Sequence, residues 1–129
     1  QEQVDMIDRK TLNEFLSTKL IDRIIASQLV MREKRFTARL KPSDVFDEYK
    51  GVKTDVTVII QGAVDLAFVE DGKLVIVDYK TDRVKDITKL AGLYKKQLYL
   101  YKSAMEQSEE LTVKECILCS IHLGAYITV

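Results

Sequence analysis

Residues 64–80 read VDLAFVEDGKLVIVDYK, and this stretch predicts the centre of the fold. Two apolar runs flank Asp71–Gly72, a dipeptide that favours the two-residue turn of a β-hairpin. Opposed residues of such a hairpin sum to a constant, here 143, so Asp65 should face Asp78 across the strand pair. Because alternate side chains of a strand share a face, Lys80 should lie beside both carboxylates.

The three charges end a hairpin that is otherwise apolar. Both of its faces are predicted to be covered, as in central strands: one carries Ala67, Val69, Leu74 and Ile76, and the other carries Val64, Leu66, Phe68, Val75, Val77 and Tyr79. Two opposed carboxylates repel each other, and the low dielectric beside an apolar face raises the cost.

A hard cation such as Mg²⁺ or Mn²⁺ would resolve this repulsion. Asp65 and Asp78 would hold it, the backbone carbonyl of Tyr79 would be a further ligand, and Lys80 would hold a nucleophilic water or a developing phosphate charge. The alternative is structural: Lys80 simply bridges the two carboxylates in an ion-pair network.

Hydrophobic spacing predicts the elements around the hairpin. Residues 5–30 predict one or two amphipathic helices through Leu12, Phe15, Leu16, Leu20 and Ile24. The other predicted elements are a strand over 30–40, a turn or short helix start at 42–44, a polar loop over 44–54, a β-rich run over 55–70 interrupted at Gly62, a helix over 85–107, and strands over 112–121 and 124–129. This order predicts an α/β fold with a mixed central sheet flanked by helices.

Length and composition suit one domain, because 129 residues with 47% hydrophobic content can bury a real core. Twenty basic and 20 acidic residues give a net charge of zero, so no global charge indicates a nucleic-acid or membrane partner. No apolar run approaches the ~18 residues of a membrane span, and no signal peptide is visible. The chain begins at Gln1 without a Met, and we expect it to be an excised piece of a longer protein.

The two cysteines, Cys116 and Cys119, have C-x-x-C spacing but lie in the strand-like stretch VKECILCSI. Residues three apart on a strand point to opposite faces, and the second pair that a zinc site needs is missing. We therefore expect structural thiols in a reducing cytoplasm and no iron–sulfur cluster. The single histidine, His122, is expected to be structural.

Taken together, these residues resemble the PD-(D/E)xK nuclease pattern in its RecB-type form. The hairpin contains GAVDL at 62–66 and VIVDYKTDR at 75–83. The helix contains Q-L-Y-L-Y, with Gln97 and Tyr101 four residues apart on one face, similar to the Q-x-x-x-Y element of that family. Within it, the chain resembles the C-terminal nuclease domains of AddA-type helicase–nucleases over nearly its whole length, down to the ending SIHLGAYITV.

The resemblance implies a restriction-endonuclease-like core and a Mg²⁺- or Mn²⁺-dependent deoxyribonuclease. Asp65 and Asp78 would be metal ligands, Lys80 the catalytic lysine, and Gln97 and Tyr101 would position the site or the DNA. Upstream, LVMREKRF at 29–36 is similar to the family strand that has Glu before an aromatic residue, which makes Glu33 a possible active-site neighbour. Read without the family, Gln97 and Tyr101 also fit helix-face packing, and Glu33 fits a solvated strand charge.

The same resemblance implies partners. DNA would be held through its phosphates, with four candidate contacts that are otherwise ordinary solvated charges: Arg83, Lys85, Lys95 and Lys96. We expect a helicase portion of the same chain and an AddB-type partner subunit, in the bacterial cytoplasm, for processing double-strand break ends in recombinational repair. The sequence has no G-x-x-x-x-G-K-[ST] loop, so ATP binding would belong elsewhere in the longer protein.

One departure from the family pattern, together with two rival readings, keeps alternatives open. The family usually has a His on a helix well before these strands, which His122 does not match, so the fragment alone could be inactive. The chain could also be a non-catalytic DNA-binding or subunit-docking module of the same fold. A stand-alone nuclease of the CRISPR-associated type is the third alternative, although its four-cysteine cluster is not present here.

Overall fold

The computed structural model describes residues 19–129, so the helical pattern predicted over residues 5–18 lies outside the described residues. The elements follow one another in the order α3 (Lys19–Ala26), β1 (Val30–Leu40), α4 (Pro42–Val45), the 3₁₀ turn η1 (Asp47–Tyr49), β2 (Val58–Glu70), β3 (Lys73–Lys80), α5 (Ile87–Glu109), β4 (Val113–Ser120) and β5 (Ala125–Thr128). The predicted strands and the long helix are therefore confirmed to within a few residues. None of the described helices is long and apolar enough to cross a membrane.

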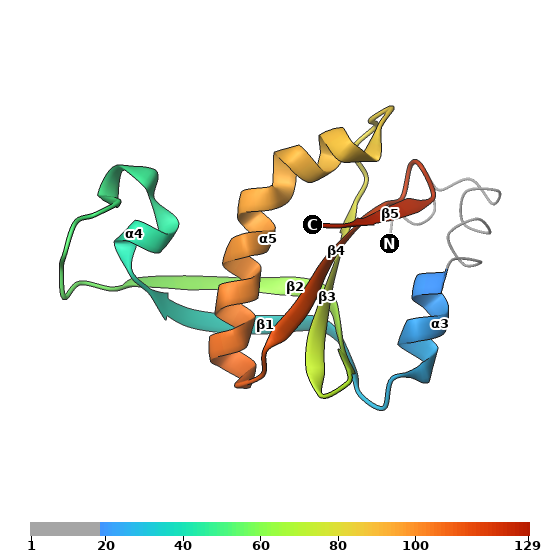
Figure 1. The fold of residues 1–129 in the computed structure, drawn as a ribbon, viewed down its shortest axis with the longest axis horizontal. Coiled ribbons are helices and arrows are strands. Elements are labelled where there is room, and N and C mark those ends of the chain that lie inside the picture. The colour runs from blue at the N-terminus through green and yellow to red at the C-terminus, as the bar shows by residue number, and fades with distance from the viewer. Residues whose placement is uncertain (1–18) are drawn as a thin grey trace.

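The five described strands form one mixed sheet in the order β1-β2-β3-β4-β5. Neighbouring strands are antiparallel except β3 and β4, which are parallel and joined by the crossover helix α5. Figure 1 shows α5 lying across the sheet, while α3 lies away from α5 on the other side of the sheet. The parallel pair brings the carboxyl ends of β3 and β4 to the same edge, where Lys80 is opposite Ser120.

The hairpin turn has the backbone that the Asp–Gly dipeptide favours, since Asp71 and Gly72 have φ of 55° and 73°. The ladder runs from Glu70↔Lys73 to Leu66↔Val77, so each pair sums to 143 and the predicted register is confirmed. The regular ladder ends there. Asp65 and Asp78 are the next two residues, at the point where β2 separates from β3.

Each face of the sheet covers its own apolar cluster, as predicted for central strands. The α5 side buries Ala67, Leu74, Ile76 and Leu118 against Leu90, Leu98 and Met105 of the helix. The α3 side buries Leu66, Phe68, Val75, Val77 and Ile117 against Leu20. Cys116 belongs to the first cluster and Cys119 to the second, so their predicted opposite orientation is confirmed.

The predicted face of Val64 is wrong, because Val64 packs on the α5 side together with Phe36. The cause is an irregularity shared by two strands. Glu33 has a φ of 48°, and Glu33 and Asp65 are missing from the β1–β2 ladder between its pairs Arg32↔Leu66 and Lys34↔Val64. The alternation of side chains between the two faces changes phase across this gap. Val64 and Ala67 are three positions apart and would point to opposite faces of a regular strand, yet both pack in the α5-side cluster.

Helix α5 has defined ends. The carboxylate of Asp86 caps its start by accepting the backbone N–H of Thr88 at 2.9 Å. Glu110, with a φ of 55°, ends it in the left-handed conformation. The helix contacts β1, β4 and β5, which fixes its inner face above the carboxyl end of β3.

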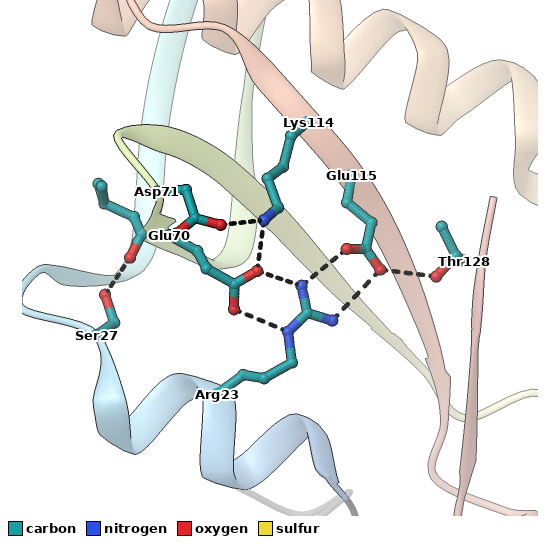
Figure 2. Close-up of polar contacts among 8 residues, drawn as sticks. Arg23, Ser27, Glu70, Asp71, Lys114, Glu115 and Thr128 are labelled. Carbon is teal, nitrogen blue, oxygen red and sulfur yellow. Dashed lines mark hydrogen bonds and ion pairs between the residues drawn. The ribbon is translucent and has the colours of Figure 1, made fainter.

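Helix α3 is anchored by an ion network at the hairpin end of the sheet (Figure 2). The guanidinium of Arg23 donates to both carboxylate oxygens of Glu70, each at 2.9 Å, and to Glu115 at 2.8 Å. Lys114 lies 2.7 Å from Glu70 and 3.1 Å from Asp71. The hydrogen bonds of Arg23 lower the pKa of Glu70 to about 2. One guanidinium thus joins a helix to two strands that are distant in sequence.

The connection from β1 to β2 forms an arm that carries α4 and η1 away from the rest of the sheet (Figure 1). Pro42 opens α4 at its first position, where the missing N–H costs no hydrogen bond. This short helix and turn occupy most of the predicted polar loop, and β2 begins at Val58 rather than at residue 55.

Candidate active site

Two acidic side chains meet where β2 and β3 separate. The backbone N–H of Tyr79 donates to Asp65 Oδ2 at 2.7 Å, so the side chain of Asp65 takes a hydrogen bond at the end of the ladder. Asp78, only 4% exposed, lies on the α5 side of β3. Burial, followed by the nearby Asp65 carboxylate, raises the pKa of Asp78 to about 6, while Lys80 opposes the shift.

The ammonium of Lys80 has three neighbours. Its Nζ lies 3.0 Å from Asp78 Oδ2 and donates to Gln97 Oε1 at 2.9 Å. It also lies 4.0 Å from the centre of the Tyr94 ring, a cation–π contact. Among the described ion pairs Lys80 contacts Asp78 and not Asp65, so it does not bridge both carboxylates as the structural alternative required.

Residues Tyr94, Gln97 and Tyr101 share the inner face of α5, at a spacing that places side chains on one side of a helix. Tyr101 makes an edge contact with Phe36, with ring centroids 5.4 Å apart. Burial, then the negative charges of Asp78 and Asp65, raises the pKa of Tyr101. Tyr101 therefore packs against Phe36 of β1, near enough to the two carboxylates for their charge to act on it. Its role in positioning the site or the DNA stays a prediction.

Two residues at this site were not predicted to belong to it. The hydroxyl of Tyr94 donates to the carboxylate of Asp82, at 2.9 Å and 3.1 Å from its two oxygens. Asp82 follows Lys80 by two positions, and Tyr94 precedes Gln97 by three. A sequence signal existed in this spacing, because a residue three positions before Gln97 lies on the same face of the helix.

Glu33 lies beside the acidic pair but does not join it. It is opposite Asp65 in the gap of the β1–β2 ladder. Its side chain is exposed, and it makes no hydrogen bond or ion pair with any described residue. Glu33 therefore lies next to the site but makes no polar contact with its described residues.

Comparison with known proteins identifies the family. A family model described as the PD-(D/E)XK nuclease superfamily matches residues 1–125. The chain belongs to this superfamily. The fold prediction, a restriction-endonuclease-like α/β core, is thereby confirmed, and the nuclease pattern read from the hairpin agrees with it.

Similar proteins are named as subunits of ATP-dependent helicase/nucleases. One from Clostridium acetobutylicum is 29% identical over 131 residues, covering 100% of this chain and 10% of the relative. Others come from Clostridium botulinum, 32% identical over 99% of this chain, and Geobacillus thermodenitrificans, 33% identical over 92%, with 10% of each relative covered. The chain thus spans about a tenth of the length of these relatives and is a PD-(D/E)XK nuclease domain related to helicase/nuclease subunits of this type.

The acidic pair of this PD-(D/E)XK domain fits a divalent cation in one respect. Asp78 Oδ2 is buried, and apart from its ion pair with Lys80 Nζ at 3.0 Å it has no hydrogen-bond partner among the described residues, so it keeps acceptor capacity that a metal could use. Residues 19–129 contain no cluster of three or more His, Cys, Asp or Glu side chains that could hold a metal ion. Asp65 and Asp78 would therefore need backbone carbonyl, water or phosphate oxygens to complete the coordination.

The predicted DNA contacts fall in two places. Arg83 and Lys85 are exposed in the loop that joins β3 to α5, directly after Lys80. Lys95 and Lys96 are exposed on α5, and Lys96 Nζ lies 3.7 Å from a carboxylate oxygen of Asp47 in η1. There they line a groove of about 590 Å³ together with Ser43, Asp44, Asp47, Lys50, Gly92 and Tyr99.

The remaining candidate residues of the sequence lie elsewhere. Cys116 and Cys119 are buried free thiols, and burial raises their pKa values to about 11 and about 12, so both stay protonated at neutral pH. His122 is exposed in the turn between β4 and β5, rather than in a strand.

Proposed function

We propose that this domain is a metal-dependent deoxyribonuclease and forms the DNA-cleaving part of a bacterial helicase–nuclease. The observation that supports this most strongly is the convergence of Asp65, Asp78 and Lys80 at one edge of the sheet, where the buried carboxylate of Asp78 has the ammonium of Lys80 on one of its oxygens. A purely structural ion pair would not need a second carboxylate beside the first, since that carboxylate raises its cost.

In the proposed mechanism, Asp65, Asp78 and the backbone carbonyl of Tyr79 would hold Mg²⁺ or Mn²⁺, which would supply Lewis-acid stabilisation of the charge developing on the phosphate. Lys80 presents its ammonium to the attacking water or to a phosphate oxygen. Gln97 holds the ammonium through the hydrogen bond at 2.9 Å. Tyr101 borders the carboxylates, and with Gln97 it positions the lysine or the DNA.

The DNA strand would be held through its phosphates. Arg83 and Lys85 would act close to the site, while Lys95 and Lys96 would hold the strand at the outer groove. Such contacts carry no sequence information, so we expect this domain to cleave without strong sequence preference.

For the longer protein we propose the role that the relatives' name suggests. The chain would be the C-terminal nuclease domain of an AddA-type protein. A helicase portion of the same polypeptide would bind ATP, and an AddB-type subunit would be its partner. Processing of double-strand break ends for recombinational repair in the bacterial cytoplasm would be the resulting activity.

The first prediction tests the lysine. In the full-length protein, Mg²⁺- or Mn²⁺-dependent cleavage of single-stranded DNA should fall by at least about 10³-fold in Lys80→Ala, because the charge that stabilises the transition state is lost. Gel-based cleavage assays measure this. Lys73→Ala, at the opposite end of β3 and exposed, is the matched control and should cleave normally.

Cleavage that persists in Lys80→Ala would refute the catalytic assignment. DNA binding by the unaltered protein without any metal-dependent cleavage would instead support the non-catalytic module that the sequence left open.

A further inference from the structure

An aromatic side chain that the proposed chemistry does not use lies against the lysine. The ring of Tyr94 lies with its centre 4.0 Å from Lys80 Nζ. The hydroxyl of the same ring donates to both oxygens of Asp82, at 3.1 Å and 2.9 Å. The face of the Tyr94 ring therefore contacts the ammonium of Lys80, and its hydroxyl binds the carboxylate of Asp82.

Three contacts surround the ammonium of Lys80. Its Nζ makes an ion pair with Asp78 Oδ2 at 3.0 Å and donates a hydrogen bond to Gln97 Oε1 at 2.9 Å. A lysine has a flexible four-carbon stem, so its head can shift while it keeps an ion pair. The face of Tyr94 attracts the cation and limits that movement.

The ring itself is fixed by the chain around it. Asp82 is two residues beyond Lys80, at the start of the loop into α5, and its half-buried side chain reaches Tyr94 on the helix. The hydrogen bond to Asp82 is also the main cause of the raised pKa of Tyr94. Tyr94 and Gln97 lie one turn apart on α5, so these two of the three neighbours of the ammonium move together with the helix.

We propose that Tyr94 and Asp82 are positioning residues for Lys80, with the Tyr94 ring holding the ammonium in place and Asp82 holding the ring. This rests on the proposed function, because the position of the ammonium matters for cleavage only if Lys80 acts in it. Neither residue needs to touch DNA or metal.

The test uses steady-state cleavage of single-stranded DNA by the full-length protein with Mg²⁺. Tyr94→Leu removes the ring face. Because the catalytic ammonium would then be misplaced, kcat should fall about 10- to 100-fold, while KM should change by less than about twofold. Tyr94→Phe keeps the face and loses the anchor, so it should recover most of kcat. Leu93→Ala is the control, since Leu93 is exposed on the same helix and lines neither the site nor the groove beside α4.

The anchor is tested by a second set. Asp82→Asn keeps an oxygen that can accept from the hydroxyl and should cleave nearly as well as the unaltered protein. Asp82→Ala should match Tyr94→Phe, and the Asp82→Ala/Tyr94→Phe double variant should be no worse than either single one, because both remove the same hydrogen bond.

Several outcomes overturn the inference. One is an unchanged kcat in Tyr94→Leu beside an inactive Lys80→Ala, which would leave the proposed function standing. A second is a raised KM with unchanged kcat in Tyr94→Leu. A third is additive losses of kcat in the Asp82→Ala/Tyr94→Phe double variant; this result tests the inference even if Tyr94→Leu does not fold. Normal cleavage by Lys80→Ala would overturn the proposed function and this inference with it.

Discussion

The ionised carboxylate of Asp78 destabilises the folded chain. Its carboxyl group would ionise near pH 3.8 in an unfolded chain, but burial and Asp65 raise its pKa in the fold to about 6. Because the folded state binds the proton more tightly, the ionised group destabilises the fold at every pH above this range. Near neutral pH, the ion pair with Lys80 reduces this penalty without removing it.

We therefore predict that Asp78→Asn abolishes cleavage and stabilises the chain. In the presence of EDTA at pH 7, the free energy of unfolding should rise by about 1–3 kcal/mol, since the unfavourable buried charge is gone. Thermal or urea denaturation measures this change. Asp55→Asn, in an exposed loop, should leave stability within about 0.5 kcal/mol; a less stable Asp78→Asn variant would contradict the argument.

Single residues also mark what a sequence can predict about such a site. Asp65, Asp78 and Lys80 follow from turn chemistry and strand alternation, which are local rules. The contact of Tyr94 with Lys80 depends on how far α5 is rotated and displaced above β3. That placement is set by packing of Leu90, Leu98 and Met105 into the sheet, and no local spacing encodes it.

Among the described elements, α3 is held to the sheet partly by charge. It contacts the sheet through the Leu20 cluster and through Arg23, whose guanidinium binds both Glu70 and Glu115. The pKa of Glu70 is lowered from 4.5 to about 2 by the hydrogen bonds from Arg23, followed by that from Lys114. A lowered carboxyl pKa gives stability that is present above pH 4.5 and is lost as pH falls toward 2.

We predict that Glu70→Gln reduces the acid sensitivity of the chain. At pH 7 the variant should be less stable by about 1–2 kcal/mol, a value kept small because the network is partly exposed and screened by salt. As the pH approaches 2, the difference from the unaltered chain should shrink toward zero. Denaturation midpoints across this pH range measure it, with Glu48→Gln as an exposed control; a constant difference would count against the network.

The strands illustrate where local rules stop. The predicted register was correct from Glu70↔Lys73 to Leu66↔Val77, because the turn sets it. The prediction for Val64 failed because the gap at Asp65 and Glu33 changes the phase of alternation. Glu33 has a positive φ that its residue type does not favour, so the residue type did not indicate the irregularity.

At the scale of the whole molecule, the net charge of zero means that the proposed DNA contacts would have to come from local groups of lysine and arginine. The groove beside α4 contains Lys50, Lys95 and Lys96 but also Asp44 and Asp47. Lys96 and Asp47 are 3.7 Å apart and exposed, so their ion pair is weak and a phosphate can replace it.

We predict that Lys95→Ala/Lys96→Ala in the full-length protein weakens binding of single-stranded DNA. The slope of log affinity against log salt should fall by about 1.4, or ~0.7 per phosphate contact, with kcat at saturating DNA nearly unchanged. Fluorescence anisotropy at several salt concentrations measures the slope. The Lys19→Ala/Lys73→Ala pair, exposed at other surfaces, is the control; an unchanged slope would place the strand elsewhere.

The paired irregularity at Glu33 and Asp65 also limits how this gene segment can change in length. Loss or gain of one codon in either strand near the gap would turn Phe36 and Val64 outward, or move Asp65 off the end of the ladder. Codons in the arm, around residues 51–57, carry no such constraint, since they lie between elements and outside the ladder. Related sequences should therefore vary in length at the arm while keeping a constant spacing from Asp65 to the hairpin turn.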